Sequence, residues 1–355
     1  MRALFMEKHG GTEQLMVGER PRPQLGRGEV VVEVRAAALN HLDLFVLQGL
    51  PGLQLEMPHI GGADGAGVIV EVGEDVTGWQ CGDEVMLNPG LWCGVCEFCR
   101  KGEESLCVRY GILGEHCAGT FAEYVKVPAT CLARRPRHLS WAEAAAFPLT
   151  FLTAWRMLVT RARLATGETI LIHGIGGGVA QAALAIAVRL GARAIVTSAD
   201  EAKLVRAKEL GAEATINYTA SDVVKEVKRL TDRRGVDVVV ETAGAATWMT
   251  SLRSAARGGR IVTCGATTGP NPAEEVRLIF WNQLSILGST MGSVRDWEGV
   301  VDAAQRWGLR PVVDSVLPLS EGRQAYERMA SGAQFGKIVL AVTADEAAAR
   351  EPIVE

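Results

Sequence analysis

Four cysteines within fifteen residues give the strongest chemical signal in the sequence. Cys93, Cys96, Cys99 and Cys107 follow the spacing C-x2-C-x2-C-x7-C. Four thiolates so close together can wrap one tetrahedral zinc ion, and a fully ligated ion has no open position for a substrate. A [4Fe–4S] cluster is the rival, although its usual last gap is three residues with a following proline. Four unrelated reduced cysteines are the third alternative. The spacing favours one structural zinc ion per chain.

A glycine-rich loop between a strand-like run and a helix-like run is the second signal. Residues 169–173 form a short β-branched run, and apolar residues recur at helical spacing from Val179 onward. Between them stand Gly174, Gly177 and Gly178, a departure from the usual G-x-G-x-x-G. An ordinary strand-to-helix turn also contains glycines. Because strand, glycine loop and helix in this order bind a dinucleotide pyrophosphate, we predict a nicotinamide cofactor.

The residues that choose between the two nicotinamide cofactors come after the next strand. An acidic residue there binds the 2′-hydroxyl of NAD, and neutral or basic residues accept the 2′-phosphate of NADP. Ser198 and Lys203 favour NADP, whereas Asp200 favours NAD unless it caps the following helix. We expect NADP(H) rather than NAD(H).

The elements that carry this loop alternate between strand and helix. Strand candidates recur at 194–197, 213–217, 236–241, 260–264 and 285–288, with helical segments at 202–210 and 222–231. Such alternation is typical of an α/β fold, here a Rossmann doubly wound parallel sheet. The last strand candidate would be an open sheet edge, which favours pairing with a second copy of the chain.

The rest of the chain differs in its predicted secondary structure. Residues 1–146 are β-rich, and mixed strands and helices return after residue 292. We therefore expect one domain of residues 1–146 and 292–355, with a cysteine lobe at about 88–110, and a Rossmann domain of residues 147–291. The glycine-dense run 61–67 is expected to be a loop.

Composition excludes several classes of protein. The 355 residues include 37 Lys and Arg against 41 Asp and Glu, a net charge of −4 that argues against a nucleic-acid partner. No apolar run approaches the length of a membrane span, and the first residues lack the features of a signal peptide. These observations indicate a cytoplasmic protein that acts on a small molecule.

These motifs together resemble the medium-chain dehydrogenase/reductase superfamily. The resemblance covers nearly the whole chain and is nearest to the zinc-lobe members called alcohol dehydrogenase or quinone oxidoreductase. It implies a GroES-like catalytic domain, a Rossmann domain, an active cleft between them, and a homodimer or homotetramer. Besides the cysteine lobe and the glycine loop, the segments that carry it are 61–73, 119–125 and 336–340.

The departures from that family are informative. Zinc alcohol dehydrogenases take three catalytic ligands from segments that here read Asn40-His41-Leu42-Asp43, Gly62-Ala63-Asp64 and Phe147-Pro148-Leu149-Thr150. None of the three positions carries a usual zinc ligand. Quinone oxidoreductases have Asn and Asp at the positions of Asn40 and Asp43.

This difference favours one reaction over another. Oxidising a simple alcohol depends on a metal that lowers the pKa of the alcohol. Reducing a quinone or an activated alkene places charge on a conjugated oxygen, which hydrogen-bond donors can stabilise. We expect the Asn40 amide to be that donor, unless it only ties two loops together. Asp43 fits a structural acceptor better than a general base, and Thr153 matches a position bordering the nicotinamide, or else packs a helix.

The resemblance also implies cofactor contacts. His41 stands where the family contacts the pyrophosphate, Tyr218 matches a tyrosine near the adenosine phosphate, and the family runs its backbone past the nicotinamide at Gly265, Ala266 and Thr267. Two alternatives stay open. One is an alcohol or aldehyde dehydrogenase with atypical metal ligands, such as Asp64 or His41 with Asn40. The other is a non-enzymatic NADPH-binding protein.

Overall fold

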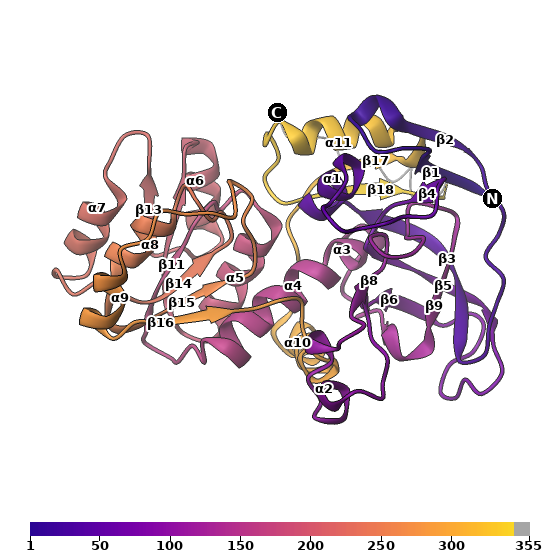
Figure 1. Cartoon of the computed structure of the whole chain (residues 1–355), viewed down its shortest axis with the longest axis horizontal. Helices are drawn as coiled ribbons and strands as arrows, with labels where there is room; N and C mark the ends of the chain where they lie inside the picture. Colours follow the sequence, from indigo (N-terminus) through magenta and orange to yellow (C-terminus); the bar gives the residue numbers. More distant parts are fainter. Residues whose placement is uncertain (344–355) are drawn as a thin grey trace. The chain divides into compact units, whose positions relative to one another are not determined.

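The computed structural model describes residues 1–343, which divide into two compact units. Unit 1 contains residues 1–149 and the described residues from 297 onward, and unit 2 contains residues 150–296. Each unit has its own sheets (Figure 1). Within the described residues, no helix combines the length and the apolar character needed to cross a membrane.

Unit 1 is built on a seven-stranded sheet with the path β10-β6-β5-β3-β18-β17, and β9 also pairs with β3. The central strand β3 contains a run of valines that is fully buried, because other strands and helices cover it on both faces. The strands of this sheet are β3 (Glu29–Ala38), β5 (Asp64–Val72), β6 (Glu84–Leu87), β9 (Tyr124–Pro128), β10 (Leu132–Arg134), β17 (Val313–Pro318) and β18 (Lys337–Ala341).

Smaller elements complete unit 1. A three-stranded sheet has the order β2-β1-β4, and β7 pairs with β8 beside the cysteine lobe. The strands are β1 (Arg2–Met6), β2 (Leu15–Glu19), β4 (His59–Ile60), β7 (Gly90–Leu91) and β8 (Gly111–Ile112). The helices are η1 (Thr12–Gln14), α1 (His41–Gln48), α2 (Glu97–Arg100), η2 (Glu104–Leu106), η3 (Ala129–Cys131), α3 (Trp141–Ala146), η5 (Leu319–Glu321) and α11 (Gly322–Ala330), and α10 (Val294–Trp307) begins at the end of unit 2.

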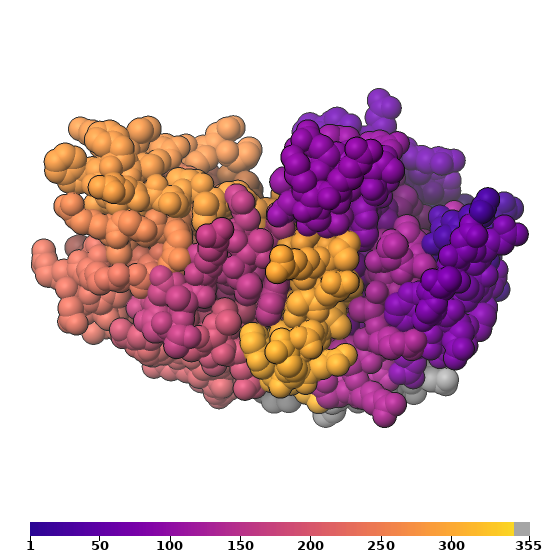
Figure 2. Space-filling model, turned by 90° about the horizontal axis from the view of Figure 1, so that it is seen from below, coloured from indigo at the N-terminus to yellow at the C-terminus, as the bar shows by residue number. Residues whose placement is uncertain are grey.

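Segments from both ends of the sequence meet in unit 1. The Arg310 guanidinium donates to Glu143 at 2.8 Å, and His138 shares a hydrogen bond with the Leu309 carbonyl at 3.1 Å. In the space-filling view, the orange-yellow C-terminal segment lies beside magenta residues of the same unit (Figure 2). The C-terminal segment also supplies β18 to the middle of the main sheet.

Unit 2 is a six-stranded parallel sheet with the order β13-β12-β11-β14-β15-β16. This is the 3-2-1-4-5-6 order of a dinucleotide-binding fold, so the predicted α/β Rossmann class is confirmed. The edge position of β16 is also as expected. The strands are β11 (Thr169–Ile172), β12 (Arg193–Ser198), β13 (Ala214–Asn217), β14 (Val236–Glu241), β15 (Ala255–Thr263) and β16 (Ser285–Gly288).

Helices flank this sheet. α7, α8 and α9 pack next to one another, and α5 packs on β11 and β12 (Figure 1). The core between them is apolar, with Leu171, Val239 and Ile261 fully buried. The helices are α4 (Pro148–Trp155, which starts at the end of unit 1), the π-helical turn η4 (Arg156–Arg161), α5 (Gly178–Arg189), α6 (Glu201–Glu209), α7 (Val223–Leu230), α8 (Trp248–Ser254) and α9 (Val276–Asn282).

The glycine-dense run of residues 61–67 is not wholly the loop that we expected. β5 begins at Asp64 and runs through Gly65 and Gly67. A Cβ atom on Gly67 would lie 2.0 Å from the Glu33 carbonyl oxygen, so these glycines let neighbouring strands approach closely inside a sheet.

Asp43 fastens the start of α1 to the neighbouring glycine turn. Its Oδ2 accepts the Asn40 N–H at 2.6 Å, and its Oδ1 accepts the Gly62 N–H at 3.2 Å. The carboxyl group is buried, and this burial raises the pKa of Asp43 from 3.8 to about 7 against the opposing effect of the Asn40 hydrogen bond. Asp43 therefore acts here as a structural acceptor.

The raised pKa gives a testable pH dependence. Because the pKa of Asp43 is about 7 in the folded state and near 3.8 when unfolded, its contribution to stability is largest below pH 3.8 and is lost as the pH rises through 7. The Asp43→Asn side chain does not titrate. We expect the free energy of unfolding of the wild type, relative to Asp43→Asn, to fall between about pH 4 and pH 7. Urea unfolding at half-unit pH intervals measures this difference.

Asp302→Asn is the control, because Asp302 is exposed on α10 and paired with Arg306. Its stability curve should run nearly parallel to that of the wild type over the same range. A constant difference between wild type and Asp43→Asn would contradict the assigned pKa.

Candidate active site and metal site

The four cysteines of the lobe come together in space. Their sulfur atoms all lie within 4.8 Å of one another, with 4.0 Å between Cys93 and Cys99 and 3.5 Å between Cys96 and Cys99. A tetrahedral zinc ion with Zn–S bonds of about 2.3 Å requires S–S separations of about 3.8 Å. The donor set and its spacing therefore fit a zinc ion, and none of the four is in a disulfide.

Backbone N–H groups contact some of these sulfurs, whereas burial, as the largest cause, raises the pKa of Cys99 to about 12. Gly94 has a φ of +72°, which closes the turn between the first two cysteines. The N–H groups of Cys93 and Arg109 both donate to the Cys107 sulfur at 3.3 Å. The backbone N–H of Val95 contributes most to lowering the pKa of Cys93 to about 6. Thiolates held by N–H donors are suitable metal ligands.

A second polar cluster, formed by Asn40, Asp64 and Lys337, lies in the middle of the unit 1 sheet. Asn40 follows β3, Asp64 begins β5 and Lys337 begins β18, and these three strands are neighbours. The register pairs Ala38 with Asp64 and with Val339, which brings the three side chains together. Asp64 is 0% exposed and Lys337 is 4% exposed.

The groups of this polar cluster satisfy one another. Lys337 Nζ donates to Asp64 Oδ2 at 2.9 Å and to Asn40 Oδ1 at 2.5 Å. Asn40 Nδ2 donates to Asp64 Oδ2 at 2.9 Å, and the Leu149 N–H donates to Asp64 Oδ1 at 2.7 Å. The buried carboxylate thus has an ammonium, an amide and a backbone N–H as partners.

These hydrogen bonds join the three segments in which zinc alcohol dehydrogenases carry their catalytic ligands. The three segments that would carry catalytic ligands do meet, through Asn40, Asp64 and the backbone of Leu149. The group at their centre that the sequence analysis missed is Lys337. Its signal was a lone charge opening the apolar strand β18. Across the described residues, the lobe cysteines form the one group of three or more His, Cys, Asp or Glu side chains with metal-binding spacing.

His41, a predicted cofactor contact, and Thr153, a predicted catalytic residue, lie in different units. His41 lies at the start of α1, where partial loss of hydration and then the nearby cation of Lys337 lower its pKa. Thr153 is buried in α4, and its hydroxyl lies 3.8 Å from the Met291 sulfur. Their contacts with a cofactor stay predictions.

The glycine loop of unit 2 has the geometry of an anion site. Gly174 has a φ of +64°, and Gly177 is the N-cap of α5. A Cβ atom at Gly177 would meet only the Gly174 carbonyl oxygen, at 3.5 Å, so space is open beside the helix start. The first N–H groups of α5, those of Gly178 and Val179, have no partner within the helix and can face a pyrophosphate.

The other cofactor candidates follow the carboxyl ends of the parallel strands. Ser198 ends β12, and the Tyr218 N–H donates to its carbonyl at 3.1 Å. The Asp200 carboxylate accepts the N–H groups of Ala202 at 2.8 Å and of Lys203 at 3.4 Å. Asp200 is therefore the N-cap of α6. This is the role that the sequence analysis gave as the alternative to ribose binding.

The segment Gly265–Thr267 follows β15 at the same edge of the sheet. All three residues are exposed, and the Thr267 N–H reaches the Thr242 carbonyl at 3.5 Å. Parallel strands place their carboxyl ends together, so this segment shares an edge with the glycine loop.

A buried polar network under the glycine loop was not foreseen. Glu241 is 0% exposed and accepts hydrogen bonds from the N–H groups of Ala243 and Gly244 and from two hydroxyls, Thr247 and Ser251, at 2.6–2.9 Å. These donors fully satisfy a buried carboxylate at the end of β14.

The network continues to the loop itself. Ser251 shares a hydrogen bond of 3.1 Å with His173 Nε2, and Thr197 contacts His173 Nδ1 at 3.5 Å and accepts the Gly174 N–H at 3.3 Å. Burial lowers the pKa of His173, which keeps the ring neutral near pH 7. Glu241 is thereby connected to the first glycine of the loop. No local sequence pattern marks this network, since it joins residues from three strands and α8.

Two family models match this chain. One is described as an alcohol dehydrogenase GroES-like domain and matches residues 26–137, and the other as a zinc-binding dehydrogenase and matches residues 178–306.

Whole-length relatives agree with these matches. A zinc-type alcohol dehydrogenase-like protein of Schizosaccharomyces pombe is 34% identical and aligns over 96% of this chain and 99% of its own. An acryloyl-coenzyme A reductase of Metallosphaera sedula is 33% identical over 96% of this chain and 99% of its own. A crystal structure of an NAD-dependent alcohol dehydrogenase is 47% identical, with a TM-score of 0.94 over 97% of this chain and 100% of that chain. This chain therefore belongs to the medium-chain dehydrogenase/reductase superfamily and is an NAD(P)-dependent oxidoreductase of its zinc type.

Proposed function

We propose that the protein uses hydride from NAD(P)H to reduce activated alkenes conjugated to a carbonyl group, or quinones, and that its zinc ion is structural. The observation that carries this proposal is the polar cluster of Asn40, Asp64 and Lys337. A catalytic zinc ion takes three protein ligands and keeps one open position. The cluster instead offers one carboxylate, one amide and an ammonium group that repels cations. A relative is named acryloyl-coenzyme A reductase, and the acryloyl group is an alkene conjugated to a carbonyl. This relative supports the same interpretation.

The chemistry matches the residues of this cluster. Hydride addition to a conjugated alkene leaves negative charge on the carbonyl oxygen, which positioned N–H donors can stabilise. One N–H of Asn40 is held by Asp64, and the second reaches the Ala38 carbonyl only at 3.4 Å. We assign this weakly held N–H to the substrate oxygen. Lys337 positions the amide through its bond to Asn40 Oδ1.

The cofactor, when bound, supplies the hydride. We assign its pyrophosphate to the start of α5 and to His41, and its nicotinamide to the segment Gly265–Thr267 and Thr153. Ser198, Lys203 and Tyr218 are assigned to the adenosine end, with NADP(H) preferred because Asp200 is occupied as a helix cap. Support for these roles comes from the family resemblance and from the shared strand edge.

We also propose that the chain assembles as a homodimer or homotetramer through β16. This strand is an edge of the unit 2 sheet, and Ile286 on it is exposed. On α9, which leads into it, Phe280 and Trp281 are 62% and 69% exposed. An open edge beside exposed aromatic side chains favours pairing with a second copy.

A substrate panel tests the proposed reaction. We expect purified protein with NADPH to reduce conjugated enones or quinones with a kcat/KM at least about 100-fold above that for oxidation of simple alcohols with NADP. Spectrophotometric cofactor turnover, with NADH and NAD in parallel, measures both directions. Metal-dependent alcohol oxidation without enone or quinone reduction would show an alcohol dehydrogenase, and absence of all turnover would favour a non-enzymatic binding protein.

Metal analysis tests the structural role of zinc. We expect about one zinc ion per chain, and Cys99→Ser should lose most of it because a site of four thiolates then has only three. The exposed Cys81, which lies outside the cluster, supplies the control Cys81→Ser, which should keep full zinc content. Two zinc ions per chain, or iron in place of zinc, would contradict the assignment.

The cofactor preference has its own test. We expect Lys203→Ala to raise the KM for NADPH about tenfold and to change the KM for NADH little, because only NADPH carries the 2′-phosphate. Lys208→Ala is the matched control, since Lys208 is an exposed residue of the same helix. Equal changes for both cofactors would remove the basis for preferring NADP(H).

A further inference from the structure

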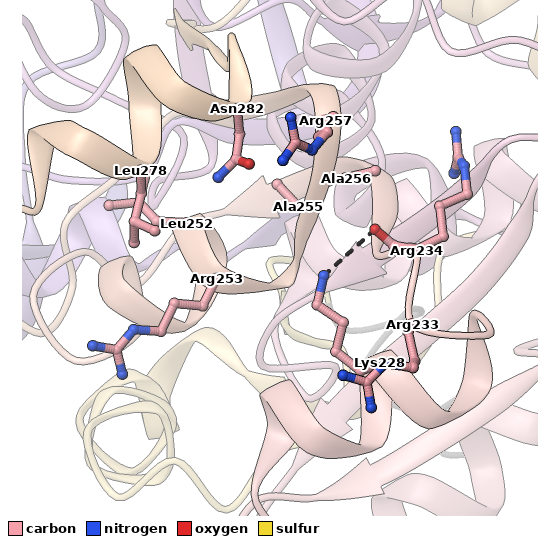
Figure 3. A pocket seen from close by; sticks show the side chains of 10 residues that line it. All are labelled: Lys228, Arg233, Arg234, Leu252, Arg253, Ala255, Ala256, Arg257, Leu278 and Asn282. Atoms are coloured by element: carbon pink, nitrogen blue, oxygen red, sulfur yellow. Dashed lines mark hydrogen bonds between the residues drawn. The ribbon is translucent and has the colours of Figure 1, made fainter.

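A pocket of about 440 Å³ opens on unit 2, and none of the residues assigned above to cofactor, substrate or zinc lines it. Its size falls within the range of small-molecule sites. Figure 3 shows its lining side chains, five of which are cationic and none acidic. The lining residues are Lys228, Arg233, Arg234, Leu252, Arg253, Ala255, Ala256, Arg257, Leu278 and Asn282.

The topology separates this pocket from the proposed cofactor site. Its residues come from the end of α7, the turn before β14, the end of α8, the start of β15, and α9. They therefore lie at the amino ends of β14 and β15, whereas the glycine loop and Gly265–Thr267 follow carboxyl ends. A strand of six residues such as β14 separates the two edges by about 20 Å.

The cations of this pocket largely lack compensation. Arg234 is paired with Asp237 at 2.5 Å. Within the described residues, no carboxylate oxygen lies within 4 Å of a side-chain nitrogen of Lys228, Arg233, Arg253 or Arg257. The carboxyl ends of α7 and α8 point here, and each helix end supplies about half of a negative charge. The Glu275 carboxylate also interacts with the charge of Arg253. Four cations still exceed what this carboxylate and two helix ends can balance.

The backbone contributes to this arrangement. The register of β14 and β15 jumps from Val236–Ala255 to Val238–Arg260, so a bulge in β15 carries Arg257. Lys228 extends across the pocket toward the Arg234 carbonyl, which it reaches at 3.4 Å (Figure 3). Burial, and then the charge of Arg233, lower the pKa of Lys228. An anion between these two side chains would relieve their repulsion.

The floor of the pocket indicates the chemistry of the part of the ligand that does not contact the cations. Leu252, Leu278 and two alanines form an apolar base, and the Asn282 amide adds one neutral polar group. Guanidinium groups bind phosphate oxygens in a bidentate manner, and four arginines line this pocket. We propose that this pocket is a binding site for a phosphate-bearing small molecule, separate from the cofactor site.

Isothermal titration calorimetry with inorganic pyrophosphate tests the site, on full-length protein saturated with NADPH so that the glycine loop is blocked. We expect pyrophosphate to bind under this condition. The triple variant Arg233→Ser, Arg253→Ser, Arg257→Ser should weaken its binding at least about tenfold, since it removes most of the phosphate contacts. A second titration with ADP distinguishes the ligand source, because tighter binding of ADP than of pyrophosphate would indicate a nucleotide.

A charge-matched variant, Arg189→Ser, Lys225→Ser, Arg295→Ser, is the control. These three residues are exposed on unit 2 and do not line the pocket. Its affinity for pyrophosphate should stay within about twofold of wild type. The proposal fails if NADPH abolishes pyrophosphate binding, if no binding occurs, or if the control variant weakens binding as much as the pocket variant. None of these outcomes depends on which substrate the enzyme reduces.

Discussion

The contact of the Lys337 ammonium with the Asp64 carboxylate, inside the unit 1 sheet, is the constraint on which the candidate active site depends. Removing one partner of such a buried pair leaves an unpaired charge, at a cost of about 3–5 kcal/mol. The Asn40 amide bridges both groups, and the Leu149 N–H completes the coordination of the carboxylate. Three neighbouring strands and the first turn of α4 are thereby fixed at one point.

Local patterns in the sequence predicted those parts of the structure that depend on residues close together in the chain. The spacing of the cysteines indicated one cluster, and the sulfurs are indeed grouped. Alternation of apolar runs with helical segments predicted the parallel sheet of unit 2, because each strand and helix carries its own periodicity. Asp200 was ambiguous between two roles, and a cap on α6 is the one that the hydrogen bonds show.

The parts that depend on strand register were harder to predict. Lys337 reaches Asn40 across 297 positions of sequence, so no local window contains the contact. The same holds for Glu241 and His173, which are joined through Ser251 on α8. Glycine content suggested a loop at residues 61–67, whereas Gly67 lets β3 and β5 approach one another. In each case the deciding neighbour comes from a distant strand.

The ammonium at the centre of the polar cluster also limits which single substitutions could create a metal site there. A single histidine or cysteine placed at residue 40 or 63 would add a ligand beside a resident positive charge, and a divalent ion would be repelled. Exchange of Lys337 alone would leave Asp64 buried without its counter-charge. Building a catalytic metal site in this cluster would therefore require several coordinated replacements, because the buried ammonium and carboxylate depend on each other.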